Sequence, residues 1–191
     1  MSDISFEDRT VIVTGAGNGL GKAYAIELGN RGAKVVVNDL GGSVDGSGSG
    51  STPADEVVNE IIANGGEAVA NYDSVATKDG GEAIVQTAID SFGTVDAVIN
   101  NAGILRDKSF AKMTEEELSL IIDVHLKGTF FVSQPAFTVM KEKNYGRIVN
   151  VASPSGLFGN FGQSNYGAAK MGIVGLTNVL AIEGAKYNIK V

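Results

Sequence analysis

Short runs rich in Val and Ile recur along the chain, and a segment with helical character separates most of them from the next. The runs cover residues 10–14, 34–38, 67–71, 95–100 and 148–151, and residues 188–191 look like the beginning of a sixth. Strands that are covered on both faces are apolar throughout. Buried strands that alternate with helices predict a parallel sheet with helices on both sides. We therefore expect an α/β protein built on a doubly wound parallel sheet of the Rossmann type.

Capping residues, glycines and prolines predict where the helices begin and end. The first helix should end near Gly32, a C-terminal glycine. Thr52 is expected to cap the next helix, with Pro53 at its first position and an end near 64–66. A third helix is expected over about 77–92, and a capping box of Thr114 and Glu117 should begin a long helix to about residue 143. Pro135 is expected to bend or interrupt that long helix.

Length and composition bound the remaining possibilities. The 191 residues suffice for one substantial domain, which we place at 1–191, and the glycine- and serine-rich stretch 41–50 is expected to be a mobile loop within it. There is no Cys and only one His, so Cys-based metal sites are excluded and we expect no metal. The net charge of −7 argues against nucleic acid as a partner. The sequence offers no membrane span and no signal peptide, so we expect an intracellular soluble protein.

A glycine-dense turn follows the first predicted strand. It reads T-G-A-G-N-G-L-G from Thr14 to Gly21, a T-G-x-x-x-G-x-G spacing. Glycines let the backbone turn sharply and approach a pyrophosphate at a helix N-terminus. Asp39 stands just past the second strand, where a carboxylate can accept hydrogen bonds from the ribose hydroxyls of a dinucleotide. The alternative is a structural turn beside a solvated carboxylate.

A candidate catalytic pair lies near the other end of the chain. Tyr166 and Lys170 are four residues apart, so on a helix they share one face. A cation near a phenol favours the phenolate, which can exchange a proton with an alcohol or a carbonyl. Ser153, at the end of the fifth predicted strand, could hold the same oxygen. Taken alone, the pair could also be part of an ordinary solvated helix face.

Together these motifs resemble the short-chain dehydrogenase/reductase family, and the resemblance covers nearly the whole chain. It is carried by residues 14–21, by Asn100-Asn101-Ala102-Gly103, and by Ser153 with Tyr166 and Lys170. Four further segments resemble the (3R)-hydroxyacyl-CoA dehydrogenase units of peroxisomal multifunctional enzymes and their bacterial relatives. These segments are NDLGG (38–42), ANYDSV (70–75), NNAGILRD (100–107) and FGNFGQSNY (158–166).

The resemblance implies NAD as the cofactor and assigns roles to particular residues. It implies that the pyrophosphate lies on the turn of Gly15, Asn18, Gly19, Leu20 and Gly21, the ribose on Asp39, the adenine on Asp73, Ser74 and Val75, and the rest of the cofactor beside Asn100, Ala102 and Gly103. It further implies that Tyr166 is the acid or base, that Ser153 orients the substrate oxygen, and that Lys170 assists Tyr166 and holds the nicotinamide ribose. The substrate would be a secondary alcohol or ketone, with a 3-hydroxyacyl-CoA favoured.

Two departures from the family pattern leave questions open. His125 stands where many members have a catalytic Asn, and it could be catalytic, support a proton relay or simply pack in the core. The family also continues past a sixth strand, so the fold is expected to be C-terminally incomplete at residue 191. The competing interpretations are a cofactor-binding scaffold without activity and a dehydrogenase for a steroid, a sugar or a simple ketone. We also expect a homodimer or homotetramer, cytoplasmic in a bacterium and peroxisomal in a eukaryote.

Overall fold

The six strands form one parallel sheet in the order β3-β2-β1-β4-β5-β6. The structure is a computed structural model that describes residues 4–43, 45–48 and 50–191. The strands are β1 (Thr10–Thr14), β2 (Lys34–Asn38), β3 (Glu67–Asn71), β4 (Ala97–Asn100), β5 (Gly146–Asn150) and β6 (Ile189–Lys190). All neighbouring pairs are parallel, and chain order reverses between β1 and β4. The predicted doubly wound parallel sheet is confirmed.

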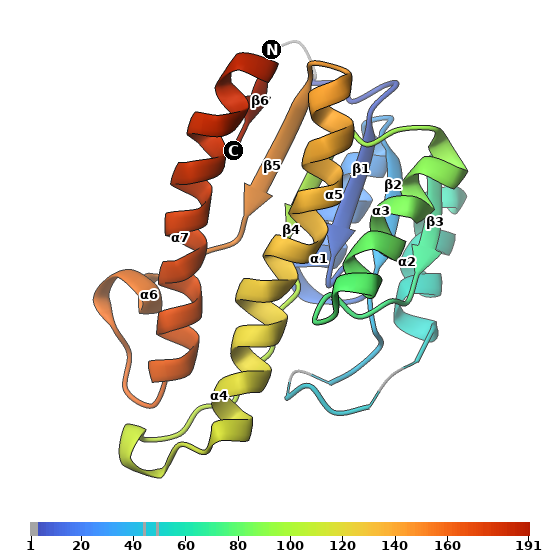
Figure 1. Cartoon of the computed structure of the whole chain (residues 1–191). Helices are drawn as coiled ribbons and strands as arrows, with labels where there is room; N and C mark the ends of the chain where they lie inside the picture. The colour runs from blue at the N-terminus through green and yellow to red at the C-terminus, as the bar shows by residue number, and fades with distance from the viewer. Residues whose placement is uncertain (1–3, 44, 49) are drawn as a thin grey trace.

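Helices cover both faces of this sheet (Figure 1). They are α1 (Gly19–Asn30), α2 (Thr52–Ala63), α3 (Lys78–Phe92), α4 (Glu115–Ile121), α5 (Gly128–Glu142), α6 (Pro154–Phe158) and α7 (Ser164–Gly184). Shorter turns are η1 (Phe110–Lys112), the π-helical η2 (Ile122–Lys127) and η3 (Ala185–Tyr187). One face carries α1 and α2, and the other carries α3, α5 and α7.

Two apolar cores form because side chains alternate along each strand. Ile12 and Val36 point toward α3 and α5, where they meet Met140 and other residues of the first core. Val11 and Val35 point to the opposite face and pack with α1 and α2. Burying a Val or Ile side chain contributes about 1.5–3 kcal/mol, so strands with both faces covered hold the sheet together.

β5 departs from the buried run that the sequence predicts. Ile148 is in the core beneath α5, but Val149 is 53% exposed. In the part of the chain that the structure describes, α1 and α2 cover only β1, β2 and β3 on the face to which Val149 points. The prediction of a buried strand at 148–151 is therefore right for one face and wrong for the other.

The long helix is interrupted at a different place from the one predicted. The capping box of Thr114 and Glu117 is confirmed, but α5 runs through Pro135 without a break. The irregular turn is η2, where the helix widens to π geometry. Proline leaves the carbonyl four residues earlier without its helical donor, and here that carbonyl belongs to Phe131. Helix α3 packs directly against this carbonyl, and it can do so because residue 81 is a glycine. A Cβ atom at Gly81 would lie only 2.5 Å from the Phe131 oxygen.

Helix ends follow the prediction with one exception. Thr77 caps α3 by accepting a hydrogen bond from the Gly80 N–H at 3.1 Å. The predicted cap at Thr52 is wrong, because Thr52 is already inside α2 and Ser51 precedes it. Ser51 has helical dihedral angles, and among the described residues its side chain accepts no capping hydrogen bond. A capping side chain needs an extended backbone at that position.

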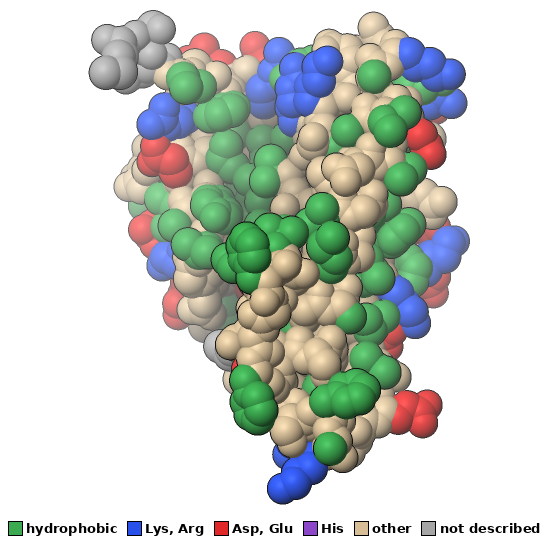
Figure 2. Space-filling model, turned by 90° about the vertical axis from the view of Figure 1, so that its left-hand side faces the viewer, with side chains coloured by type: hydrophobic (Ala, Val, Ile, Leu, Met, Phe, Trp, Pro, Cys, Tyr) green, Lys and Arg blue, Asp and Glu red, His purple; other side chains and the backbone are tan. Residues whose placement is uncertain are grey.

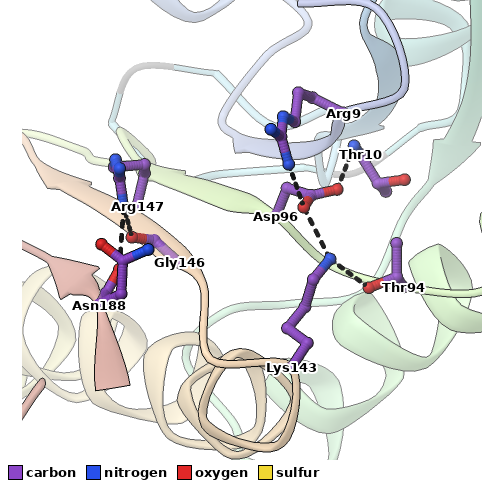
Figure 3. A network of polar contacts seen from close by, with 8 residues as sticks. All are labelled: Arg9, Thr10, Thr94, Asp96, Lys143, Gly146, Arg147 and Asn188. Atoms are coloured by element: carbon purple, nitrogen blue, oxygen red, sulfur yellow. Dashed lines mark hydrogen bonds and ion pairs between the residues drawn. The ribbon is translucent and has the colours of Figure 1, made fainter. Parts of the chain in front are cut away.

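A buried carboxylate fastens the amino ends of the strands (Figure 3). Asp96, just before β4, is only 2% exposed. It accepts hydrogen bonds from Lys143 Nζ at 2.6 Å, from the Thr10 N–H at 2.9 Å and from Arg9 at 3.3 Å. A charge taken out of water requires such partners. This network therefore joins β1, β4 and the end of α5 at the edge of the sheet opposite to the glycine turn.

Candidate active site

The glycine turn lies between the carboxyl end of β1 and the start of α1. Gly15 has a positive φ of +63°, and a side chain there would lie 2.7 Å from the Ala102 Cα. At Gly21, a side chain would overlap the carbonyl oxygen of Gly15. Gly19 also has a positive φ, +56°, yet no heavy atom of the described chain lies within 4 Å of its would-be Cβ. The turn is thus packed on the protein side and open at Gly19, where Asn18 and Leu20 are also exposed.

Asp39 lies directly against this turn. One carboxylate oxygen accepts the Gly17 N–H at 2.7 Å, and the other accepts the Gly41 N–H at the same distance. Each oxygen keeps a further acceptor position, because an ionised carboxylate offers about four lone pairs. The carboxylate is fixed between Gly17 and Gly41 and can accept hydrogen bonds from two neighbouring hydroxyls.

Thr14 and Asn101 join the two halves of the sheet at the point where chain order reverses. The Thr14 hydroxyl accepts the N–H groups of Asn101 and Ala102, both at 3.1 Å. The Asn101 amide donates to the carbonyls of Thr14 and Gly15, both at 3.0 Å. This seam holds the glycine turn against the segment after β4. Ligands of open α/β sheets bind at such a reversal.

A buried amide network supports the segment predicted to contact adenine. The Asn38 amide donates to Asn71 Oδ1 at 2.8 Å and to the Asp73 carbonyl at 2.9 Å. The Asn71 amide in turn donates to the Asp73 carboxylate at 2.7 Å. Ser74 follows in the same segment, and Val75 is buried against Gly128. Asp73 and Ser74 therefore lie at the same edge of the sheet as Asp39.

Tyr166 and Lys170 lie on one face of α7, as their spacing predicts. Lys170 Nζ is 5.6 Å from the centroid of the Tyr166 ring. The lysine is only 4% exposed, and its ammonium donates to the Val151 carbonyl at 2.6 Å. Burial lowers the pKa of Lys170 from 10.5 to about 8, because a charged ammonium loses solvation in the interior. The site thus holds the Tyr166 phenol beside a buried lysine ammonium, which loses its proton at a lower pH than an exposed lysine does.

Ser153 lies between β5 and α6, which packs on α7. Its Oγ accepts the Ser155 N–H at 3.2 Å, so the hydroxyl proton remains available to a substrate oxygen. Gly156 allows the close contact of the two helices, since a side chain there would lie 2.9 Å from the Met171 nitrogen. The N-terminus of α6 thus places Ser153 beside the helix that carries Tyr166 and Lys170.

His125, in the π-helical turn η2, is buried next to the catalytic candidates. Its Nε2 lies 2.8 Å from the Ile104 carbonyl oxygen and 3.1 Å from the Ile104 nitrogen. Its Nδ1 has no hydrogen-bond partner within the described residues. Burial, assisted by the charge of Lys170, lowers the pKa of His125 from 6.5 to about 4. A neutral imidazole therefore packs beneath Gly103, where any side chain would overlap its ring.

The predicted site residues thus gather at one edge of the sheet. Asn100 differs from the others, because its side chain points inward and donates to Ser133 and Asn150 at 2.9 and 2.8 Å. Sequence reasoning missed three polar residues: Thr14, Asn165 and Thr177. Thr14 is the first residue of the glycine motif, but the motif does not predict its contact with the segment after β4, and the other two have partners far away in the sequence.

Other features of the described chain point to no second site of known kind. A polar hollow of about 630 Å³ lies at the opposite edge of the sheet, between Glu27, Arg31 and Glu67, far from the catalytic candidates. Residues 4–43, 45–48 and 50–191 contain no group of three side chains suited to hold a metal ion. No helix within these ranges is long and apolar enough to cross a membrane.

The fold and this arrangement define a class of protein, and comparison with known proteins agrees. The model of the family described as short chain dehydrogenase matches residues 9–191. The chain belongs to this short-chain dehydrogenase/reductase family, whose members bind NAD(P), act on small-molecule substrates and often form oligomers.

Among curated proteins, the chain is similar to dehydrogenase units of multifunctional enzymes. It is 62% identical over 189 residues to the peroxisomal hydratase-dehydrogenase-epimerase of Saccharomyces cerevisiae, covering 99% of this chain and 21% of that protein. It is 57% identical over 188 residues to the peroxisomal multifunctional enzyme type 2 of Mus musculus, covering 98% of this chain and 25% of that protein. The chain therefore spans about a quarter of these relatives or less.

A solved structure supports the same assignment. The crystal structure of a short chain dehydrogenase from Mycobacterium avium superimposes with a TM-score of 0.90 at 47% sequence identity. The match covers 97% of this chain and 66% of that one. The predicted resemblance to the family is confirmed.

Proposed function

We propose that the protein is an NAD-dependent oxidoreductase that interconverts a secondary alcohol and a ketone, with a (3R)-3-hydroxyacyl-CoA as the alcohol. The observation that carries the proposal is the buried Lys170 ammonium beside the Tyr166 ring, on a helix that meets Ser153. A cofactor site without chemistry would not need a buried cation next to a phenol. The intact trio also argues against an inactive scaffold.

The chain's own residues account for the proton transfer. In the oxidation direction, the alcohol oxygen accepts a hydrogen bond from Ser153 and gives its proton to the Tyr166 phenolate. The C–O bond becomes C=O as the hydride leaves the carbinol carbon with its electron pair. The bound cofactor supplies the acceptor for that hydride. Lys170 stabilises the phenolate, and in the ketone-reduction direction the same proton returns from Tyr166.

The turn and Asp39 fit the proposed cofactor. The N–H groups at the start of α1 offer an anion site beside open space at Gly19. Asp39 would accept hydrogen bonds from both adenosine ribose hydroxyls of NAD. An NADP phosphate at the same place would meet a carboxylate, and Asn18, Leu40 and Gly41 supply no cation to neutralise it. These residues therefore favour NAD over NADP.

The thioester substrate is proposed from similarity. The relatives that the chain matches at 57–62% identity carry names of peroxisomal multifunctional enzymes, one of them naming a dehydrogenase. Exposed apolar side chains of α6 and the following loop, Leu157, Phe158 and Phe161, offer a surface for an acyl chain.

The experiment is NADH formation by the full-length protein with (3R)- and (3S)-3-hydroxyacyl-CoA of matched chain length. We expect turnover with the (3R) isomer to exceed that with the (3S) isomer by at least about tenfold, a difference of about 1.4 kcal/mol. Equal rates, or activity confined to steroids or simple ketones, would reject the thioester while keeping the dehydrogenase. No turnover with any of these alcohols would favour the inactive scaffold.

The outward face of α7 supports a homodimer or homotetramer. Met171, Val179 and Ile182 are at least half exposed there, and Gly175 leaves the helix surface flat. Figure 2 shows hydrophobic side chains over the face formed by α6 and α7. Such a patch marks an association surface.

With relatives named as peroxisomal, we assign a peroxisomal location in a eukaryote and a cytoplasmic one in a bacterium.

A further inference from the structure

Two polar anchors hold α7 on either side of its catalytic candidates. The first is Asn165, which is only 1% exposed although its side chain is polar. Its amide donates to the Arg106 carbonyl at 3.0 Å and to the Glu117 carbonyl at 3.1 Å. Its Oδ1 accepts the Tyr166 N–H at 2.7 Å. This one amide joins the start of α7 to the segment before η1 and to α4.

The second anchor is Thr177, two turns beyond Lys170. The Asn150 amide at the end of β5 donates to Thr177 Oγ1 at 2.9 Å, and this hydroxyl donates to the Ile173 carbonyl at the same distance. Asn150 in turn accepts the Asn100 amide at 2.8 Å. These hydrogen bonds between side chains therefore join α7 to β5 and, through β5, to β4.

The two anchors fix both the position of α7 along its axis and its rotation about that axis. Thr177 lies seven residues after Lys170, which is about 10.5 Å along a helix and on the same face. Asn150 immediately precedes Val151, whose carbonyl accepts the Lys170 ammonium. A shift of α7 by one residue, about 1.5 Å, would break both anchors and move the ammonium from its acceptor. Displacement of a reacting group by about 1 Å can cost about a hundredfold in rate.

We propose that Asn165 and Thr177 are positioning residues that set where Tyr166 and Lys170 lie relative to β5 and the cofactor turn. Their effect on rate rests on the proposed function, but the placement of Lys170 can be measured without turnover. Neither side chain needs to touch substrate or cofactor for this role, because each acts through α7.

The variants preserve side-chain shape and change polar contacts, and Asn165→Asp also adds a charge. Thr177→Val removes the hydroxyl, and Thr177→Ser restores it. The matched control is Thr138→Val on α5, an exposed threonine with the same hydrogen bond to the carbonyl four residues before it, at 3.2 Å to Gln134. Asn165→Asp replaces the amide donors with an acceptor facing two carbonyls. Its control is Asn59→Asp, exposed on α2 and away from the proposed association surface.

In the full-length protein, we expect Thr177→Val and Asn165→Asp each to lower kcat by at least about tenfold, with the KM for NAD changed less than about threefold. The KM for NAD should change less than kcat, because the residues proposed to bind the adenosine part of NAD belong to β1, α1 and β2. The pH profile of kcat/KM for alcohol oxidation should shift, since the buried Lys170 ammonium beside Tyr166 is displaced. Thr177→Ser and both controls should stay within about twofold of the wild type.

The second readout is the titration of Lys170 itself, followed by NMR of protein labelled with ¹³C at lysine Cε and assigned with Lys170→Arg. The titratable groups identified around the ammonium are Tyr166 on α7 and His125 in η2. In the wild type the midpoint should lie at about 8, the pKa that burial gives Lys170. In Thr177→Val it should move upward, because a displaced ammonium regains water. Asn165→Asp is excluded from this readout, because its added carboxylate would raise the Lys170 pKa by charge alone.

The outcomes separate the two proposals. If the wild type turns over no alcohol while the Lys170 titration still moves in Thr177→Val, the proposed function is wrong and the positioning role stands. If Thr177→Val and Asn165→Asp keep the wild-type kcat and pH profile, and Thr177→Val keeps the Lys170 midpoint, the positioning role is overturned. Should Asn165→Asp fail to fold, as circular dichroism would show, Thr177→Val alone decides, because it retains the shape of the side chain.

Discussion

The imidazole of His125 lies edge-on to the phenol ring of Tyr166, with ring centroids 5.1 Å apart and ring planes at 84°. This T-shaped packing is a favourable arrangement for aromatic rings. It depends on the wider π turn, which directs His125 inward, and on Gly103, which leaves room for the ring. The contact gives His125 a structural link to the ring of Tyr166.

The low pKa of His125 predicts a specific pH dependence of stability. Its pKa of about 4 lies below the ordinary value of 6.5, so the unfolded chain binds a proton first as the pH falls. The stability it contributes is therefore present above pH 6.5 and is lost toward pH 4, at up to about 1.4 kcal/mol per pH unit. Urea unfolding across this range should show a smaller loss for His125→Gln than for the wild type. Because the chain has one His, its NMR signal should not titrate above about pH 5 in the folded protein.

Tyr166→Phe tests the proton-transfer assignment. We expect NAD affinity to stay nearly unchanged, because the residues placed near the adenosine lie on other elements. The rate constant kcat should fall at least about 100-fold, the low end of a general acid–base contribution. Steady-state kinetics and NAD titration of the full-length variant measure the two quantities. Full activity in the Phe variant would remove Tyr166 from the mechanism.

Gly19→Ala should separate cofactor binding from folding. The positive φ of Gly19 makes a side chain cost about 1–2 kcal/mol, but the open space around it means that no protein atom is displaced. The added methyl would instead occupy the space proposed for the pyrophosphate. We expect calorimetry to show NAD affinity at least about tenfold weaker, with unfolding cooperative as before. Unchanged NAD affinity would place the cofactor elsewhere.

Asp39 should set the preference for NAD. A phosphate within about 4 Å of the carboxylate costs on the order of 4 kcal/mol per unit charge pair at an effective dielectric near 20, before screening by salt. We therefore expect kcat/KM to favour NAD over NADP by at least about tenfold. Asp39→Ala should reduce this ratio mainly by weakening NAD, and Leu40→Arg should begin to admit NADP. Equal kcat/KM for both cofactors in the wild type would show that Asp39 does not face the ribose.

Asp96→Ala should destabilise the fold without a direct effect on chemistry. It removes the acceptor for the Thr10 N–H and for two cationic side chains at the amino ends of the strands (Figure 3). Breaking a buried ion pair costs about 3–5 kcal/mol, and we expect about 2–4 because Lys143 and Arg9 are partly exposed. Chemical denaturation measures the loss. The folded fraction should keep its kcat. A lower kcat in fully folded protein would contradict the expectation that the Asp96 edge of the sheet does not affect the catalytic edge.

The strands and the cofactor turn could be predicted because their signals are local. A run such as residues 34–38 is apolar and short, and its observed bounds match the predicted ones. The turn is defined by glycines close together in sequence. Val149 could not be placed, because its exposure depends on which helices cover the sheet. Pro135 misled the prediction, since the break in the long helix lies instead at the π turn.

The supporting polar contacts were beyond sequence reasoning for a different reason. Asn165 bonds to carbonyls 48 and 59 residues away, and Thr177 meets an amide 27 residues away. An isolated Asn or Thr on a helix reads as a solvent-facing or neutral residue. Only the fold shows that Asn165 is buried, that Thr177 is half-buried, and that each joins separate elements.

The seam between Thr14 and Asn101 has a consequence for how the protein folds. Its partners are 87 residues apart in the chain, so closing it requires a long loop to lose entropy before any bond repays the cost. The β1–α1 unit can form early from local contacts, but its glycine turn acquires the Asn101 amide only after β4 has docked. We therefore expect the cofactor-binding crevice to form only after β4 has paired with β1, and a nascent chain to bind dinucleotide in the native manner no earlier than that.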